Sequence, residues 1–143
     1  MKKVISILLS IFMLCSVTAG LDLTAYAADT TITGKCGESA TYSYNKNTKT
    51  LTISGTGVID STDGNFPSSD SIVSLVIKDG ITGIGAWVFD ECKNLESINM
   101  PDSVTEIGEG AFYQCTALEK VAFSESLTTI GEMAFGECSK ISS

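Results

Sequence analysis

The sequence predicts an α/β solenoid in which coils of about 23 residues, each with a short parallel strand and short helical turns, stack behind a small β-hairpin cap. Two observations lead to this fold class. Three segments that begin at Ile81, Val104 and Leu127 are nearly alike, and the interval from each start to the next is the same. Within them, aliphatic residues, a glycine, an aromatic residue and a cysteine recur at fixed positions. A period of this length is typical of repeat proteins in which each coil shares its buried surface with the next.

Residues 1–27 have the pattern of a secretion signal. Lys2 and Lys3 precede an apolar run at 4–17, and small residues lie at Ala25 and Ala27. The run is shorter than the roughly 20 residues that a membrane-spanning helix needs. We therefore expect cleavage after residue 27 and a mature chain that is secreted or cell-wall associated, without insertion into a membrane.

The charge of the mature chain excludes several classes of function. Removal of residues 1–27 takes away Lys2, Lys3 and Asp22, which leaves 7 lysines, 16 acidic residues and a net charge of −9. Nucleic-acid-binding proteins need clustered basic side chains, so we expect no nucleic acid partner. The chain has no histidine, which is the usual general base and a common zinc ligand. We expect no enzymatic activity, no cofactor and no metal site.

Residues 28–70 do not carry the repeat and are predicted to form an N-terminal β-rich cap. Polar and apolar residues alternate at 41–44 and at 50–54, on either side of a turn-rich segment, 45–49, which indicates a β-hairpin. We expect Gly55 and Gly57 to end the second strand. A solenoid leaves the core and strand edge of its first coil exposed unless another element covers them, and the hairpin is well placed to do so.

A polar loop is predicted at 61–70. Its beginning, with Asp60, Asp63 and Gly64, faintly resembles a calcium-binding loop. The spacing does not fit the EF-hand pattern, because Thr62 stands where a second Asp or Asn is required. An ordinary loop is the favoured interpretation.

The repeat region, 71–143, contains three full units at 72–94, 95–117 and 118–140 and a truncated fourth. In each strand, inward positions are predicted to alternate with outward ones. The second half of each coil has two further aliphatic positions, a glycine, and a short helical segment whose Phe and Cys point inward. The inward strand columns are Ile72, Leu95, Leu118 and Ile141; Leu75, Ile98 and Val121; and Ile77, Met100 and Phe123.

Cysteines occupy one column of the repeat. Cys92, Cys115 and Cys138 are each separated by one repeat length, so they are predicted to lie above one another in successive coils. Three thiols in one column cannot all pair with each other. The favoured interpretation is a column of buried, reduced thiols, and a disulfide between two neighbours is the alternative. Cys36 lies outside this column, in the cap.

The repeat pattern I-x-x-I-G-x-x-A-F-x-x-C-x-x-L-x-x-I-x-x-P resembles the BspA-type leucine-rich repeat of bacterial surface proteins. Residues 104–123 match it, and residues 81–101 nearly do. The resemblance implies a secreted or wall-associated protein that engages other macromolecules, in some members host matrix components, with no shared catalytic residue or cofactor. The sequence departs from the pattern at Val88, at Lys78 and Ser124 in place of the proline, and at Trp87.

The outward strand positions are the candidate binding face. They are small, polar and weakly charged, so a merely solvated sheet face is the alternative interpretation. Trp87 is a separate candidate, because tryptophan is enriched in binding hot spots; the alternative is that it folds onto the cap or first coil and completes the core. The candidate residues of the strands are Ser74, Val76, Lys78, Ser97, Asn99, Lys120, Ala122 and Ser124.

These observations favour a non-catalytic extracellular interaction module that binds a protein or another macromolecule. The alternative is a structural spacer or an accessory module of a longer secreted enzyme or wall-anchored protein. The sequence stops just after Ile141 begins another strand. We therefore expect either a fragment of a longer protein or a frayed last turn, and an exposed edge through which the chain could self-associate.

Overall fold

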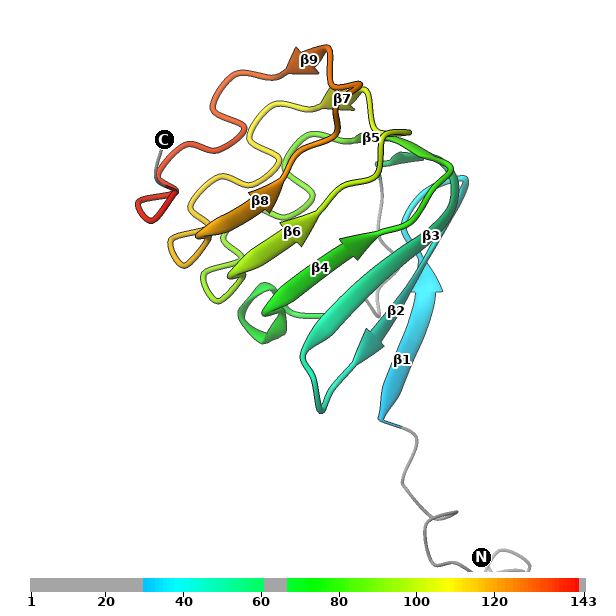
Figure 1. Cartoon of the computed structure of the whole chain (residues 1–143). Helices are drawn as coiled ribbons and strands as arrows, with labels where there is room; N and C mark the ends of the chain where they lie inside the picture. Colours follow the sequence, from blue (N-terminus) through cyan, green and yellow to red (C-terminus); the bar gives the residue numbers. More distant parts are fainter. Residues whose placement is uncertain (1–29, 61–66, 142–143) are drawn as a thin grey trace, which may run out of the picture.

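The computed structural model describes residues 30–60 and 67–141, in which two parallel β-ladders share the long strand β3 (Figure 1). The strand order is β8-β6-β4-β3-β5-β7-β9. Strand β2 pairs with β3 in the antiparallel direction, and β1 pairs in the same way with β2. The predicted signal peptide and most of the calcium-like loop lie outside the described residues. The strands are β1 Thr31–Lys35, β2 Ser39–Asn45, β3 Thr50–Ile59, β4 Ser74–Ile77, β5 Ile81–Ile84, β6 Ser97–Asn99, β7 Glu106–Ile107, β8 Lys120–Ala122 and β9 Thr129–Ile130.

The predicted hairpin is confirmed as the antiparallel pair β2 and β3. Tyr42 lies opposite Ile53 and Tyr44 opposite Leu51, and all four side chains are buried. The turn is closed by the side chain of Asn45, whose Oδ1 accepts hydrogen bonds from the backbone N–H groups of Asn47 and Thr48 at 2.9 and 3.1 Å. Strand β1, which the sequence analysis did not predict, pairs with the outer edge of β2.

The expectation that Gly55 and Gly57 end the second strand is wrong, because β3 continues through both glycines to Ile59. Their φ angles are +103° and +88°, values that glycine adopts without a Cβ penalty. The first half of β3 pairs with β4 and its second half with β5, with a register shift between Gly57 and Val58. Both ladders of the solenoid therefore begin on one strand of the cap.

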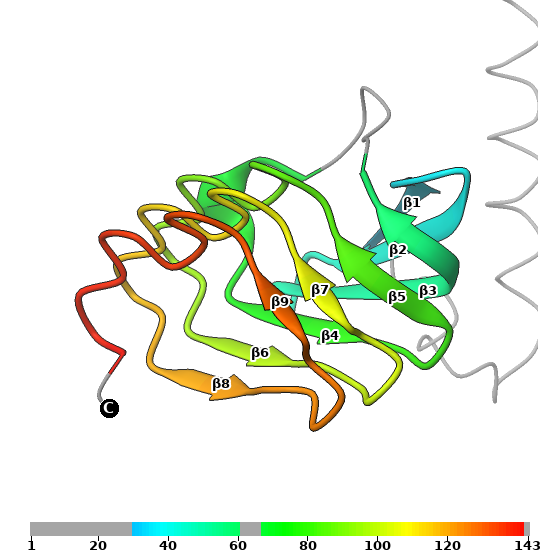
Figure 2. The same cartoon turned by 90° about the horizontal axis from the view of Figure 1, so that it is seen from above.

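The coils stack in the predicted register. Strands β4, β6 and β8 form one side, on which Leu75, Ile98 and Val121 lie in line. Strands β5, β7 and β9 form a second side. Figure 2 shows these two sides meeting at short turns, with irregular segments closing the third side of each coil. Partners in neighbouring coils are separated by one repeat length, which confirms the parallel solenoid and its period.

The short helical turns predicted after each glycine are not helices. The described residues contain one short 3-10 turn, Ser69–Ser71, and no other helix. Left-handed backbone angles interrupt these segments every four residues, at positions 87, 91, 110, 114, 133 and 137, where φ lies between 54° and 61°. Several backbone N–H groups of these segments donate to carbonyl groups of the next coil instead. Phe89 N–H donates to the carbonyl of Ala111 at 2.9 Å, and Phe112 N–H to that of Ala134 at 2.8 Å. These inter-coil bonds use the donors that a helix would need.

The core is a set of columns that run along the solenoid axis. Phe112 stacks almost parallel between Phe89 and Phe135, with ring centroids 5.3 and 5.2 Å apart. Phe89 and Phe112 are fully buried, whereas Phe123 and Ile130 in the last described coil are 46% and 53% exposed. No further coil covers them within the described residues. In this part of the chain, no helix has the length and apolar character needed to cross a membrane.

Candidate binding face

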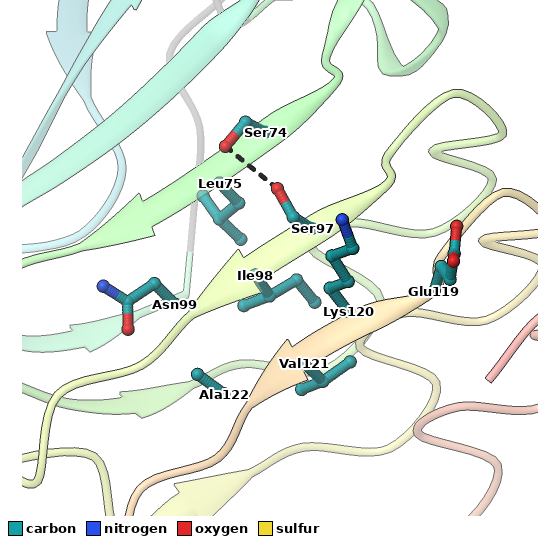
Figure 3. Close-up of a pocket in the computed structure, with 9 residues that line it drawn as sticks. All are labelled: Ser74, Leu75, Ser97, Ile98, Asn99, Glu119, Lys120, Val121 and Ala122. Carbon is teal, nitrogen blue, oxygen red and sulfur yellow. Dashed lines mark hydrogen bonds between the residues drawn. The ribbon is translucent and has the colours of Figure 1, made fainter. Parts of the chain in front are cut away.

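Six of the predicted candidate residues lie together on the outer face of β4, β6 and β8. The ladder places them in two rows across the three strands, since parallel strands in register align equivalent outward positions. Figure 3 shows five of these side chains, those of Ser74, Ser97, Asn99, Lys120 and Ala122. The rows are Ser74, Ser97 and Lys120, and Val76, Asn99 and Ala122.

An open groove follows these rows, with a volume of about 450 Å³. The Ser97 hydroxyl donates a hydrogen bond to the Ser74 hydroxyl at 3.2 Å, which links neighbouring coils at one end of the groove (Figure 3). The other end is framed by the amide of Asn99 and the methyl group of Ala122. Short side chains and one lysine leave the strands open to approach. The groove is lined by Ser74, Leu75, Ser97, Ile98, Asn99, Glu119, Lys120, Val121 and Ala122.

Two further predicted face residues lie at the strand ends, with different outcomes. Lys78 is exposed directly after β4, and its backbone N–H bonds to the carbonyl of Ile53 at 3.0 Å. Ser124 was expected to face outward, and this is wrong, because it is only 5% exposed. Its Oγ accepts a hydrogen bond from the N–H of Ser126 at 3.1 Å, and its carbonyl accepts one from Leu127 at 3.3 Å. Ser124 therefore closes the turn after β8 and is unavailable to a ligand.

Trp87 is not on this face. It lies on the irregular segment after β5 and is 45% exposed, so the interpretation that it completes the core is wrong. Its indole ring occupies the space above Gly110, where a Cβ would collide with it. Its ring also meets Tyr113 edge-on, with centroids 5.8 Å apart.

Sequence reasoning missed Glu119 in the groove and a column of threonines on the β5, β7 and β9 side. Thr82, Thr105 and Thr128 recur at the repeat interval, which was the available signal. Thr105 donates its hydroxyl to the carbonyl of Thr82 at 3.2 Å, and Thr128 to that of Thr105 at 2.9 Å. Because the hydroxyls are used between coils, this column links the coils to one another. No cluster of three metal-ligating side chains occurs in the described ranges.

The cysteine column lies inside the coils as free thiols. Cys115 donates to the carbonyl of Phe89 at 3.3 Å, and Cys138 to that of Phe112 at 3.1 Å. The pKa of the Cys115 thiol is raised to about 12: hydrogen bonding with Cys138 lowers it, but hydrogen bonding with Cys92 and burial raise it by more. The pKa of Cys138 is also raised, by its hydrogen bond with Cys115 and by burial. Thiols held in the neutral form are poor nucleophiles.

We expect Cys115 to resist alkylation by iodoacetamide at pH 8 in the folded protein and to react once the protein is unfolded. Peptide mapping by mass spectrometry measures this residue by residue. Because folding raises this pKa, the stability gained from a neutral thiol is present below the ordinary value of 9.0 and is lost as the pH rises toward 12. Recovery of Cys115 in a disulfide with Cys92 or Cys138 would contradict this assignment.

Comparisons with known proteins agree with this geometry. The family model described as the BspA type leucine-rich repeat region matches residues 61–143. A leucine-rich repeat protein from Eubacterium ventriosum is similar over 75% of this chain, with 27% identity and a TM-score of 0.57. A leucine-rich cell surface protein from Faecalibacterium prausnitzii is similar over 80%, with 25% identity and a TM-score of 0.50. The chain spans 36% of the length of each of these two proteins. A comparison with curated proteins finds no match.

Proposed function

Because this chain belongs to the BspA-type leucine-rich repeat family, we propose that it is a secreted or cell-surface module that binds a protein or another extracellular macromolecule through the face of β4, β6 and β8. The proposed role is binding without catalysis. The signal-like residues 1–27 and the similarity to a cell surface protein support an extracellular location.

The observation that carries this proposal is the register of the three strands. It aligns two rows of mostly short side chains, with one lysine, over three successive coils and leaves an open groove of about 450 Å³ there. Hydroxyl, amide and ammonium groups can bond to a polypeptide backbone or to polar side chains. An extended segment of a partner that lies across the three strands would meet side chains of three successive coils in turn.

A second candidate function is a spacer or accessory module within a longer secreted or wall-anchored protein. It is favoured by one observation, that both similar proteins are much longer than the matched segment. Rows of inter-coil hydrogen bonds on all sides give the stiffness that a spacer needs.

Substitution of Ser97 by arginine tests the face directly. The long side chain would extend from the middle strand, β6, into the groove, so we expect it to weaken binding to an immobilised matrix protein by about tenfold or more, on the order of one well-packed interface contact. Fibronectin, fibrinogen, laminin and collagen are the probes, measured by surface plasmon resonance. The matched control is Ser126→Arg, at an exposed position in the turn between β8 and β9. Equal binding by both variants would rule out this face, and binding of none of the four proteins would favour the spacer.

A further inference from the structure

A second exposed surface lies on the irregular side of the coils, away from the groove. We define it as the aromatic strip, made of Trp87, Tyr113 and Met133. Trp87 is 45% and Met133 51% exposed, and Tyr113 is partly exposed. Trp87 lies over Gly110, and Tyr113 lies over Gly136, where an added Cβ would be 2.9 Å from the phenol ring. Each ring therefore occupies a place that a glycine of the next coil leaves vacant.

The strip is held by the backbone and needs little ordering when a partner binds. Position 87 and its equivalents 110 and 133 all have left-handed φ angles, of 61°, 57° and 56°. Trp87 N–H bonds to the carbonyl of Glu109, and Gly110 N–H to that of Glu132, each at 3.0 Å. The ring planes of Trp87 and Tyr113 meet at 71°. Pre-organised aromatic side chains lose little conformational entropy on binding, which is a common property of interface hot spots.

Two exposed glutamates flank this strip along the chain. Glu109 directly precedes Gly110, on which the indole lies, and Glu132 directly precedes Met133; both are exposed. Asp90 contributes a carboxylate oxygen, Oδ1, that is shielded from solvent and has no hydrogen-bond partner in the structure as described.

Carboxylates outnumber lysines on the irregular side of the coils. The irregular segments 85–94, 108–117 and 131–140 contain five carboxylates and two lysines. One of these lysines, Lys93, is already paired with Glu91 at 2.9 Å. Residues 74–79, 96–102 and 119–125, on and beside β4, β6 and β8, also contain five carboxylates and two lysines, so the irregular side is distinguished by an exposed indole ring beside its carboxylates rather than by its net charge. The five carboxylates of the irregular segments are those of Asp90, Glu91, Glu109, Glu132 and Glu137.

We propose that the aromatic strip binds a lysine- or arginine-bearing segment of a protein partner, with a cationic side chain against the Trp87 indole and the carboxylates of Glu109 and Glu132 around it. A guanidinium or ammonium group is attracted by the face of an indole ring, and carboxylates form charge-assisted hydrogen bonds with the same groups. A glycan is the rival ligand for exposed aromatic residues. It is less favoured, because rings inclined at 71° do not form one flat platform and the surrounding charge gives no advantage to a neutral sugar.

Trp87 is the one tryptophan of the chain, so its fluorescence reports on this surface alone. The probes are hexa-arginine, hexaglutamate, an uncharged glycine-serine hexapeptide and cellohexaose. We expect hexa-arginine alone to change the Trp87 emission in a saturable way, and its affinity to fall as salt is raised. A response to cellohexaose with none to hexa-arginine would overturn the proposal in favour of a glycan site. A response to neither would overturn it altogether.

Variants then separate a specific site from general attraction to an acidic protein. Trp87→Ala is expected to weaken hexa-arginine binding by about tenfold in calorimetric titrations, within the range of desolvated cation–π contacts. The double variant E109Q/E132Q is expected to weaken it by a similar factor, and it keeps the test valid if Trp87→Ala fails to fold. The matched control is E96Q/E125Q, which removes the same charge at exposed positions elsewhere. Equal losses in the two double variants would show non-specific attraction and overturn the proposal. Loss of matrix-protein binding in Ser97→Arg is a separate result, because that residue lies on the other face.

Discussion

Replacement of Phe112 by alanine is expected to lower the free energy of unfolding by about 3–5 kcal/mol, the usual range for removal of a fully buried phenylalanine. Phe112 is 0% exposed and stacks against Phe89 on one side and Phe135 on the other. Its loss leaves a cavity between two coils that the inter-coil hydrogen bonds prevent from closing. Urea denaturation followed by circular dichroism measures the change.

The matched control is Phe135→Ala, which removes the same side chain one coil further on. Phe135 is only partly buried and stacks on one phenylalanine of its column, so we expect a clearly smaller loss. Since coils are stabilised mainly by their neighbours, Phe112→Ala should weaken the contact on both sides of its coil. Equal losses in the two variants would mean that the stack does not carry the stability we assign to it.

The repeat period predicted the ladder register, because strands that recur at a fixed interval and stack in parallel must align equivalent residues. It placed Ser74, Ser97 and Lys120 in one row without any tertiary information. The prediction failed at Ser124, which the alternation of inward and outward positions along the strand had placed on the outer face. The strand had already ended there, and the residue closes a turn. Alternation predicts direction only as far as the strand continues.

The irregular side of the coils could not be predicted from local preferences. Trp87, Glu91, Gln114, Met133 and Glu137 adopt left-handed φ angles that their side chains do not favour. Of the six left-handed positions in the irregular segments, only position 110 holds a glycine, the one residue there whose type indicates this conformation. The conformation is set by hydrogen bonds to the next coil, which a helical segment would not offer. The exposure of Trp87 has the same origin, because its place depends on a glycine in the next coil.

The continuation of β3 through Gly55 and Gly57 could not be predicted for a related reason. Glycine-containing clusters commonly bound a strand, and only the pairing with β4 and then β5 shows that the strand continues through Gly55 and Gly57. One strand thereby starts both ladders. The cap is consequently part of the solenoid's hydrogen-bonded structure, and damage at these glycines should reach both faces.

Replacement of Gly55 by alanine is therefore expected to cost about 3 kcal/mol or more of unfolding free energy, since its φ of +103° alone strains any L-residue by about 1–3 kcal/mol. An added Cβ would also overlap the carbonyl oxygen of Ser39 on β2, a rigid backbone atom that pairs in the hairpin. Thermal and urea unfolding measure the total loss.

Gly57→Ala is the matched control, because it separates the two contributions. Gly57 has a similar φ of +88°, but a Cβ there would meet no atom within 4 Å. We expect only the conformational penalty, roughly 1–3 kcal/mol, and a smaller loss than for Gly55→Ala. Hydrogen exchange locates the damage: since β3 pairs with β4 at one end and β5 at the other, Gly55→Ala should speed exchange in both strands. Faster exchange in β4 alone would mean that the two ladders are independent, and that the cap supports the binding face without connecting it to the second side of the solenoid.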